Sequence, residues 1–246
     1  MTPEYRDKDG RLMKQTGLIR GVPLIKFKSR KLVESLQTGT VYLNCLKWFR
    51  DYEDDAGNVV VGDSFEGMLH VNEGELIIQN TGKNEKLNNS LLRTVSSNAY
   101  VYCMTYIDPK ADEFRFSESQ KTEFREFGDS ALVIYDSNEF LRRIKAAAKE
   151  QGYRVFLSNV HYYDPNEDCA NVWVSLLNGM HNIAFWKRNS YMKQQEFRIV
   201  IPDDGYSLDH LELKIGDISD ISEIFSIEEV LEMEIKRCSD TGHGQN

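Results

Sequence analysis

One short segment of this sequence concentrates the side chains that could do chemistry. It runs from Lys187 to Arg198 and combines several cations, a pair of adjacent amides and the carboxylate of Glu196. Side chains alternate along a strand, so Glu196 and Arg198 are expected to share one face. A carboxylate beside a guanidinium at the edge of a cleft could bind a ribose or a phosphate. The equally weighted alternative is an ion pair at the surface of the protein.

The surrounding pattern predicts the elements that position this segment. Apolar residues at helical spacing indicate a helix over 30–37 that ends at Gly39, with strands on either side, and a second amphipathic helix over 138–151. An N-cap at Ser137 or Asn138 is expected for that second helix. The expected strands are 24–29, 40–44, 99–106, 130–135 and 196–202.

Other stretches have weaker patterns. Residues 51–57 are rich in acidic side chains and are expected to form a solvated loop. Residues 68–79 resemble a hairpin broken at Gly74, followed by a polar excursion over 80–89. Helices are expected over 169–187 and 226–236.

The composition narrows the class of protein. Hydrophobic residues make up 41% of the chain and charged residues 28%, the balance of a folded protein. The net charge of -9 argues against a surface that coats nucleic acid non-specifically. No apolar run is long enough to span a membrane, so we expect a cytoplasmic protein with no membrane contact. The cysteines and histidines are too scattered for a disulfide framework or a metal site.

No linker or internal repeat divides the sequence. We therefore expect a flexible leader over residues 1–21, one α+β domain over 22–237 and a disordered tail over 238–246. The order of the elements favours a split or mixed β-sheet core with flanking helices.

Five short blocks stand out, at 24–29, 39–44, 63–67, 102–104 and 187–199. Their order and spacing resemble the signature of a bacterial family known as domain of unknown function 2971. Tyr191 and Gln194 stand where that family usually has a Trp and a Glu, and the family's Asn-Asp-Pro-Phe-Glu block appears here as residues 62–66 after a longer insertion. The family name implies no activity.

Three motifs also resemble elements of the ADP-ribosyltransferases, which bind NAD in the cleft of a split sheet. Residues 194–196 are similar to the Gln-x-Glu carboxylate motif, 39–42 to the Gly-x-x-Tyr strand, and 97–100 to the Ser-x-x-Tyr element of the His-Tyr-Glu branch. On the first strand, Lys26 stands where a His or Arg is expected.

The resemblance implies a role for each matching residue. Breakage of the bond between nicotinamide and ribose passes through a state like an oxocarbenium ion, which a nearby carboxylate stabilises. Glu196 would supply that carboxylate, with Gln194 and Tyr42 as its catalytic companions. Tyr42 and Tyr100 would stack on nicotinamide, unless they are ordinary core aromatics of their strands.

The cofactor-binding set implied by the resemblance also contains two cations. Lys26 would place a charge near the ribose and pyrophosphate of NAD. Arg198 would orient Glu196 or bind phosphate.

The preferred hypothesis is an NAD-dependent mono-ADP-ribosyltransferase, with NAD as its substrate. A toxin or phage-defence effector of this kind would modify RNA, DNA or a protein, and an antitoxin or chaperone protein could be its partner. One alternative is a metal-dependent nuclease with Asp63, Glu66 and Glu196 as ligands. Another is a non-catalytic module whose basic segment 187–193 binds a phosphate or a partner.

Overall fold

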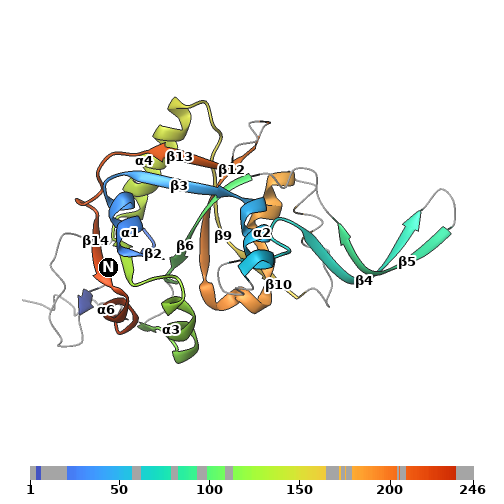
Figure 1. The fold of residues 1–246 in the computed structure, drawn as a ribbon, viewed down its shortest axis with the longest axis horizontal. Coiled ribbons are helices and arrows are strands. Elements are labelled where there is room, and N and C mark those ends of the chain that lie inside the picture. Colours follow the sequence, from blue (N-terminus) through green and yellow to red (C-terminus); the bar gives the residue numbers. More distant parts are fainter. Residues whose placement is uncertain are drawn as a thin grey trace, which may run out of the picture. The chain divides into compact units, whose positions relative to one another are not determined.

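The structure is a computed structural model that describes residues 4–6, 21–56, 62–78, 83–92, 99–108, 113–164, 172, 175, 179–203, 205 and 209–236. Over these residues the chain is mixed α+β (Figure 1). Among the described residues, every helix is too short or too polar to span a bilayer.

The sequence predicts one domain, whereas the contacts of the chain group into two compact units. Unit 1 comprises Met1–Val41, Met104–Gln151 and Leu213–Asn246, and unit 2 comprises Tyr42–Cys103 and Gly152–Glu212. Boundaries between the units fall within three strands, β3 (Thr40–Cys45), β6 (Ala99–Tyr106) and β13 (His210–Lys214).

Unit 1 is built on antiparallel strands in the order β6, β2, β8 and β14. Leu24 of β2 lies opposite Tyr106 of β6 on one side and Ile134 of β8 on the other. All five residues of β8 are buried, as its apolar sequence predicts for a central strand. The bounds are Leu24–Lys28 for β2, Ser130–Ile134 for β8 and Ser222–Ser226 for β14.

Helix α1 (Arg30–Gln37) confirms the predicted helix and its predicted end. It buries Val33 and Leu36, and Leu32 lies on its exposed side. Gly39 has a φ of +99°, and a Cβ atom there would lie 2.2 Å from the backbone oxygen of Gly216. Only glycine fits this close approach at a positive φ, so it ends the helix.

The other helices of unit 1 begin at side-chain caps. Asp136 caps α4 (Ser137–Glu150) by accepting a hydrogen bond from the backbone N–H of Glu139 at 3.0 Å. The predicted caps Ser137 and Asn138 were therefore wrong by one or two positions. Ser117 and Ser226 form capping boxes for α3 (Glu118–Arg125) and α6 (Ile227–Leu231).

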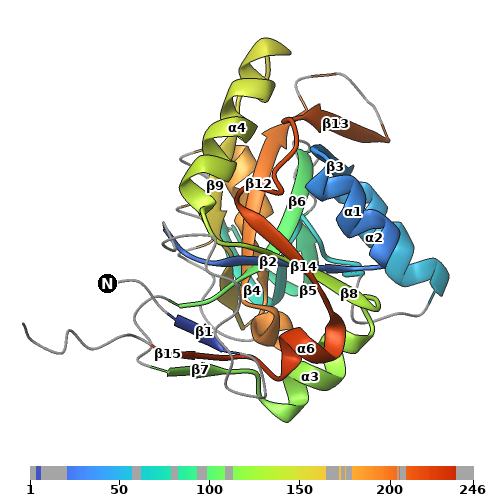
Figure 2. The same cartoon turned by 90° about the vertical axis from the view of Figure 1, so that its left-hand side faces the viewer.

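A small sheet closes unit 1, with β15 (Glu234–Lys236) between β1 (Glu4–Arg6) and β7 (Glu113–Arg115) (Figure 2). Strand β1 falls in the predicted leader, whose other residues except Gly21 lie outside the described part of the chain, as does the predicted tail. The helix expected over 226–236 was wrong beyond α6, because β15 follows it.

Unit 2 contains strands in the order β3, β6, β12 and β9, with β13 beside β3, and the pairs β3–β6 and β12–β9 are antiparallel. The predicted strand near residue 196 is confirmed as β12 (Glu196–Pro202), which pairs with β9 (Phe156–Asn159). A separate parallel pair joins β10 (His161–Tyr163) to β11 (Trp186–Arg188). Two 3-10 helices flank β11: η1 (Met180–Phe185) and η2 (Asn189–Gln194).

Two predictions within unit 2 were wrong. The expected acidic loop is mostly helix, because α2 extends over Leu46–Ala56. Trp48 stacks on Tyr52 one turn later and Lys47 pairs with Asp51, contacts that a helix brings together.

The expected hairpin over 68–79 is instead one ten-residue strand, β4 (Leu69–Ile78), with Gly74 inside it opposite Leu87. Its partner is β5 (Lys83–Leu92), which occupies most of the predicted polar excursion. Most of the helix expected over 169–187 lies outside the described residues, and its described end forms η1 and β11.

The two leucines of α1 provide a matched test of the core. Leu36→Ala should lower the free energy of unfolding by about 2–5 kcal/mol, because it leaves a cavity at a side chain that is 2% exposed. Leu32→Ala, the same change on the exposed side, should stay within about 0.5 kcal/mol of wild type. Urea denaturation measures both, and equal effects would contradict the packing of α1.

Candidate functional site

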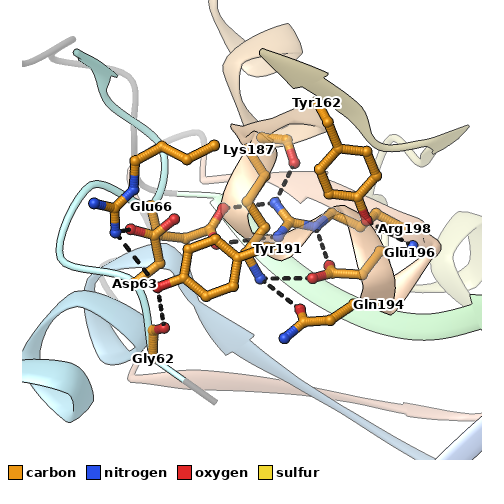
Figure 3. Close-up of polar contacts among 11 residues, drawn as sticks. Gly62, Asp63, Glu66, Tyr162, Lys187, Tyr191, Gln194, Glu196 and Arg198 are labelled. Carbon is orange, nitrogen blue, oxygen red and sulfur yellow. Dashed lines mark hydrogen bonds and ion pairs between the residues drawn. The ribbon is translucent and has the colours of Figure 1, made fainter. Parts of the chain in front are cut away.

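Three cations and three carboxylates meet in unit 2, contributed by β11, β12 and the turn at 62–67. Figure 3 labels Asp63, Glu66, Lys187, Glu196 and Arg198, whose side chains converge from these elements. Five of the six are almost fully buried, and only Arg188 is partly exposed. We call this set the charge network: Asp63, Glu66, Lys187, Arg188, Glu196 and Arg198.

Glu196 uses both carboxylate oxygens within the charge network. Lys187 Nζ lies 2.6 Å from Oε1, and Arg198 Nε lies 2.8 Å from Oε2. The backbone N–H of Glu196 donates to the Tyr162 hydroxyl at 2.9 Å. Burial alone would raise the pKa of Glu196, but the charges of Arg198 and Lys187 outweigh it and hold the pKa well below its usual range. Glu196 is therefore ionised at neutral pH.

Arg198 is the most heavily bonded member of the charge network and is 1% exposed. Its Nη1 and Nη2 atoms donate to the two oxygens of Glu66 at 2.6 and 3.0 Å, a bidentate pair. Nη1 also donates to the backbone oxygen of Ala184 in η1 at 2.6 Å. Burial alone would lower the pKa of Arg198, but the charges of Glu196 and Glu66 raise it by more. The pKa of Arg198 therefore lies well above its usual value, and the side chain stays a cation.

Lys187 links Glu196 to η2. Its Nζ donates to Gln194 Oε1 at 2.9 Å and lies 4.3 Å from the centre of the Tyr191 ring. Tyr191 in turn donates its hydroxyl to the backbone oxygen of Gly62 at 3.1 Å. The ammonium is thus enclosed by a carboxylate, an amide and an aromatic face.

Arg188 joins the 62–67 turn to β11. Its guanidinium pairs with Asp63 and lies 4.4 Å from the centre of the Phe65 ring. Asp63 also shapes the turn, because its Oδ1 accepts from the Phe65 N–H at 3.0 Å and its backbone oxygen accepts from the Glu66 N–H at 2.8 Å. Arg50 of α2 donates to the backbone oxygen of Glu66 at 2.7 Å. The turn presents Glu66 to Arg198.

Tyr42 lies outside the charge network, on the accessible side of β3. It is 44% exposed, and its ring stacks on His210 of β13 with centroids 4.4 Å apart. Partial burial raises the pKa of Tyr42, and the charges of Glu212 and Asp209 raise it further. Strand β6 pairs with β3 and with β12, so Tyr42 and Glu196 belong to strands that are not direct neighbours.

The remaining candidate residues lie in strands. Tyr100 is 1% exposed within β6, opposite Cys45 of β3, which is the environment of a core aromatic. Lys26 is half-buried in β2 and belongs to unit 1, opposite Leu132 of β8. The other candidates, Tyr42, Tyr100, Gln194, Glu196 and Arg198, belong to unit 2.

The charges of the network balance, which limits its chemistry. Each carboxylate proposed as a nuclease ligand pairs with a cation: Asp63 with Arg188, Glu66 with Arg198, and Glu196 with both Lys187 and Arg198. Over the described residues, no group of three or more His, Cys, Asp or Glu side chains could hold a metal ion. In the same way, Lys187, Arg188 and Arg198 are each paired with one or more of these carboxylates.

A trough of ≈ 380 Å³ lies in unit 1 between α4 and residues 214–215. Its lining includes none of the candidate residues, and its charged side chains are three cations and two carboxylates. Because cations and carboxylates line the trough together, it favours neither an anionic nor a cationic ligand. The trough therefore does not identify a substrate.

Sequence reasoning missed several parts of this arrangement. It considered Asp63 and Glu66 only as metal ligands of the alternative nuclease and not as partners of arginines, and it did not place His210 beside Tyr42. The signal for the first was the composition of the 187–199 block, which holds four cations and one carboxylate, so its cations need acceptors from elsewhere in the chain. No local signal connects Tyr42 to His210, because 168 residues, the difference between their numbers, separate them.

Comparisons with models of protein families, with curated proteins and with solved structures find no match for this chain.

Removal of one partner from the charge network should be costly. Glu66→Gln should lower the free energy of unfolding by about 3–5 kcal/mol, because it leaves the buried Arg198 without its bidentate carboxylate. The matched control is Glu228→Gln, which breaks the exposed pair with Arg125 and should leave stability close to wild type. Urea denaturation compares the two, and similar losses would contradict a structural role for the network.

The low pKa of Glu196 predicts a dependence of stability on pH. In the unfolded chain this carboxyl binds a proton near its ordinary pKa of about 4.3, whereas the folded protein keeps it ionised to lower pH. The stability that ionised Glu196 contributes is therefore fully present above the pKa of the unfolded chain. It is lost as the pH falls below that value toward the lower pKa of the folded protein. Between about pH 5 and pH 3 the unfolding free energy should fall less steeply in Glu196→Gln than in wild type, as measured by urea denaturation. Parallel slopes would contradict this.

Proposed function

We propose that this chain is an NAD-dependent mono-ADP-ribosyltransferase in which Tyr42 receives the nicotinamide ring. The observation that supports the proposal is the exposed Tyr42 ring, stacked on His210. The nicotinamide ring of oxidised NAD is planar and positively charged. An aromatic face close to the carboxylates of Glu212 and Asp209 favours such a ring through stacking and through charge.

In this proposal Glu196 is the carboxylate that stabilises positive charge on the ribose. Its ionised state at neutral pH suits that role, since only the anion stabilises an oxocarbenium-like state. Arg198 and Gln194 act as positioning residues, because Arg198 bonds to Glu196 directly and Gln194 acts through Lys187. The buried Tyr100 supports the sheet, and a role for Lys26 in binding NAD stays a prediction.

The wider parts of the proposal rest on resemblance alone. They are membership in the domain of unknown function 2971 family, a role as a toxin or phage-defence effector in the cytoplasm, and an acceptor that is RNA, DNA or protein. An antitoxin or chaperone protein as partner belongs to the same set.

One observation favours a second candidate, a non-catalytic binding module. Both oxygens of Glu196 are already bonded to buried cations, so the carboxylate is covered in this conformation. The cations Lys187 and Arg188 pair with carboxylates and are poorly placed to hold a phosphate. A module of this kind would use the exposed Tyr42 ring to hold a cationic group of its partner.

Binding and turnover of NAD separate these candidates. We expect purified protein to bind NAD and release nicotinamide, with Tyr42→Ala weakening binding about three- to tenfold through lost stacking. Tyr42→Phe, which retains the ring, should bind like wild type. Calorimetry measures binding and chromatography measures nicotinamide.

The role of Glu196 is tested in the same assays. Glu196→Gln should bind NAD but release no nicotinamide, provided that circular dichroism shows a folded protein. Binding without release by the wild type would favour the module, and an absence of both would exclude NAD as the ligand of this chain.

A further inference from the structure

The η2 helix is a short surface segment in which most side chains face solvent. Asn189, Ser190, Met192 and Lys193 are exposed, with Met192 at 59%. A 3-10 helix has poorer hydrogen-bond geometry than an α-helix. Such segments open locally at low cost compared with the core of a protein.

Two inward side chains attach η2 to the rest of unit 2 (Figure 3), and the exposed Asn189 adds a hydrogen bond from its Nδ2 to Asp164 Oδ2 at 3.1 Å. Tyr191 donates to the backbone oxygen of Gly62 at 3.1 Å, and Gln194 accepts from Lys187 Nζ at 2.9 Å. Both lie against the ammonium that pairs with Glu196. The two attachments therefore cover Lys187 and, through it, Glu196.

Gln195, which joins η2 to β12, adopts a left-handed conformation with φ 45° and ψ 56°. It is the one residue other than glycine with a positive φ within the described ranges. A side chain with a Cβ is disfavoured there, and Gln lacks the short polar group that helps Asn or Asp adopt this conformation. This unfavourable conformation is released if the segment detaches.

We infer that residues 189–195 form a strap that opens as a unit and uncovers Lys187 and Glu196. The pairs of Arg198 with Glu66 and Glu196 lie outside the strap, so opening leaves them intact. Access of a ribose hydroxyl to Glu196 through this opening rests on the proposed function, whereas the motion itself does not.

Hydrogen exchange followed by mass spectrometry tests the motion without any ligand. Peptides covering 189–195 should exchange through an opening that is insensitive to low urea concentrations, while amides of β12 such as those of Ile199 and Val200 should exchange only through unfolding. Equal rates and equal urea dependence for the two sets would overturn the inference.

Substitutions at Gln195 provide the matched series. Gln195→Gly and Gln195→Asn fit the left-handed conformation better, so each should reduce local opening about fivefold. Gln195→Ala keeps the unfavourable conformation and removes only the side-chain contacts, so it controls for their loss. The inference would be overturned if Gln195→Gly and Gln195→Asn reduced local opening no more than Gln195→Ala does.

The outcome is separable from that of the proposed function. Strap opening in a protein that neither binds nor turns over NAD would contradict the transferase and leave the strap intact. The opposite result is also possible to distinguish. If nicotinamide release depends on Glu196 but the strap exchanges only by unfolding, the transferase is supported and the inferred opening of the strap is overturned.

Discussion

The buried guanidinium of Arg198 is the constraint on which the structure of unit 2 depends. A cation that is 1% exposed must have its charge and its donors satisfied, and Glu66, Glu196 and the backbone oxygen of Ala184 satisfy them. These acceptors come from the 62–67 turn, from β12 and from η1. Each of these elements must therefore lie within hydrogen-bond distance of Arg198. Arg50 of α2 donates to the backbone oxygen of Glu66, so the position of α2 is tied to the same turn.

This constraint also shapes what the site can do. The three carboxylates of the charge network, a side-chain type that binds metals, are paired with cations, and its three cations, a type that binds phosphate, are paired with these carboxylates. Among the predicted site residues that the structure describes, Tyr42 is the one with an exposed side chain, beside His210. Under the proposed function, chemistry at Glu196 requires movement of the segment that covers Lys187, and the left-handed Gln195 at the end of that segment bears on this movement.

The sequence predicted elements well where one pattern dominated. Residues 99–106 are rich in aromatic and β-branched side chains, and β6 occupies that range; the α1 helix likewise ends before Gly39 as predicted. Prediction failed where local composition suggested a break that contacts between particular residues overcame. Gly74 suggested a break, yet pairing with Leu87 on β5 keeps β4 continuous. The acidic residues near 51 suggested a loop, although aromatic and charged pairs one turn apart stabilise α2.

By itself the sequence determined the mixed α+β composition, the strand alternation that puts Glu196 and Arg198 on one face, and the candidate status of the 187–198 segment. Those properties follow from neighbouring residues, whose spacing dictates which side chains share a face. Only the tertiary structure decided that Glu196 is buried among cations and that Tyr42 lies exposed beside His210. Tyr42 and His210 are far apart in the sequence, and Arg198, which pairs with Glu196, is held by Glu66 at a separation of 132 residues. Burial sets the cost of leaving any such charge unpaired.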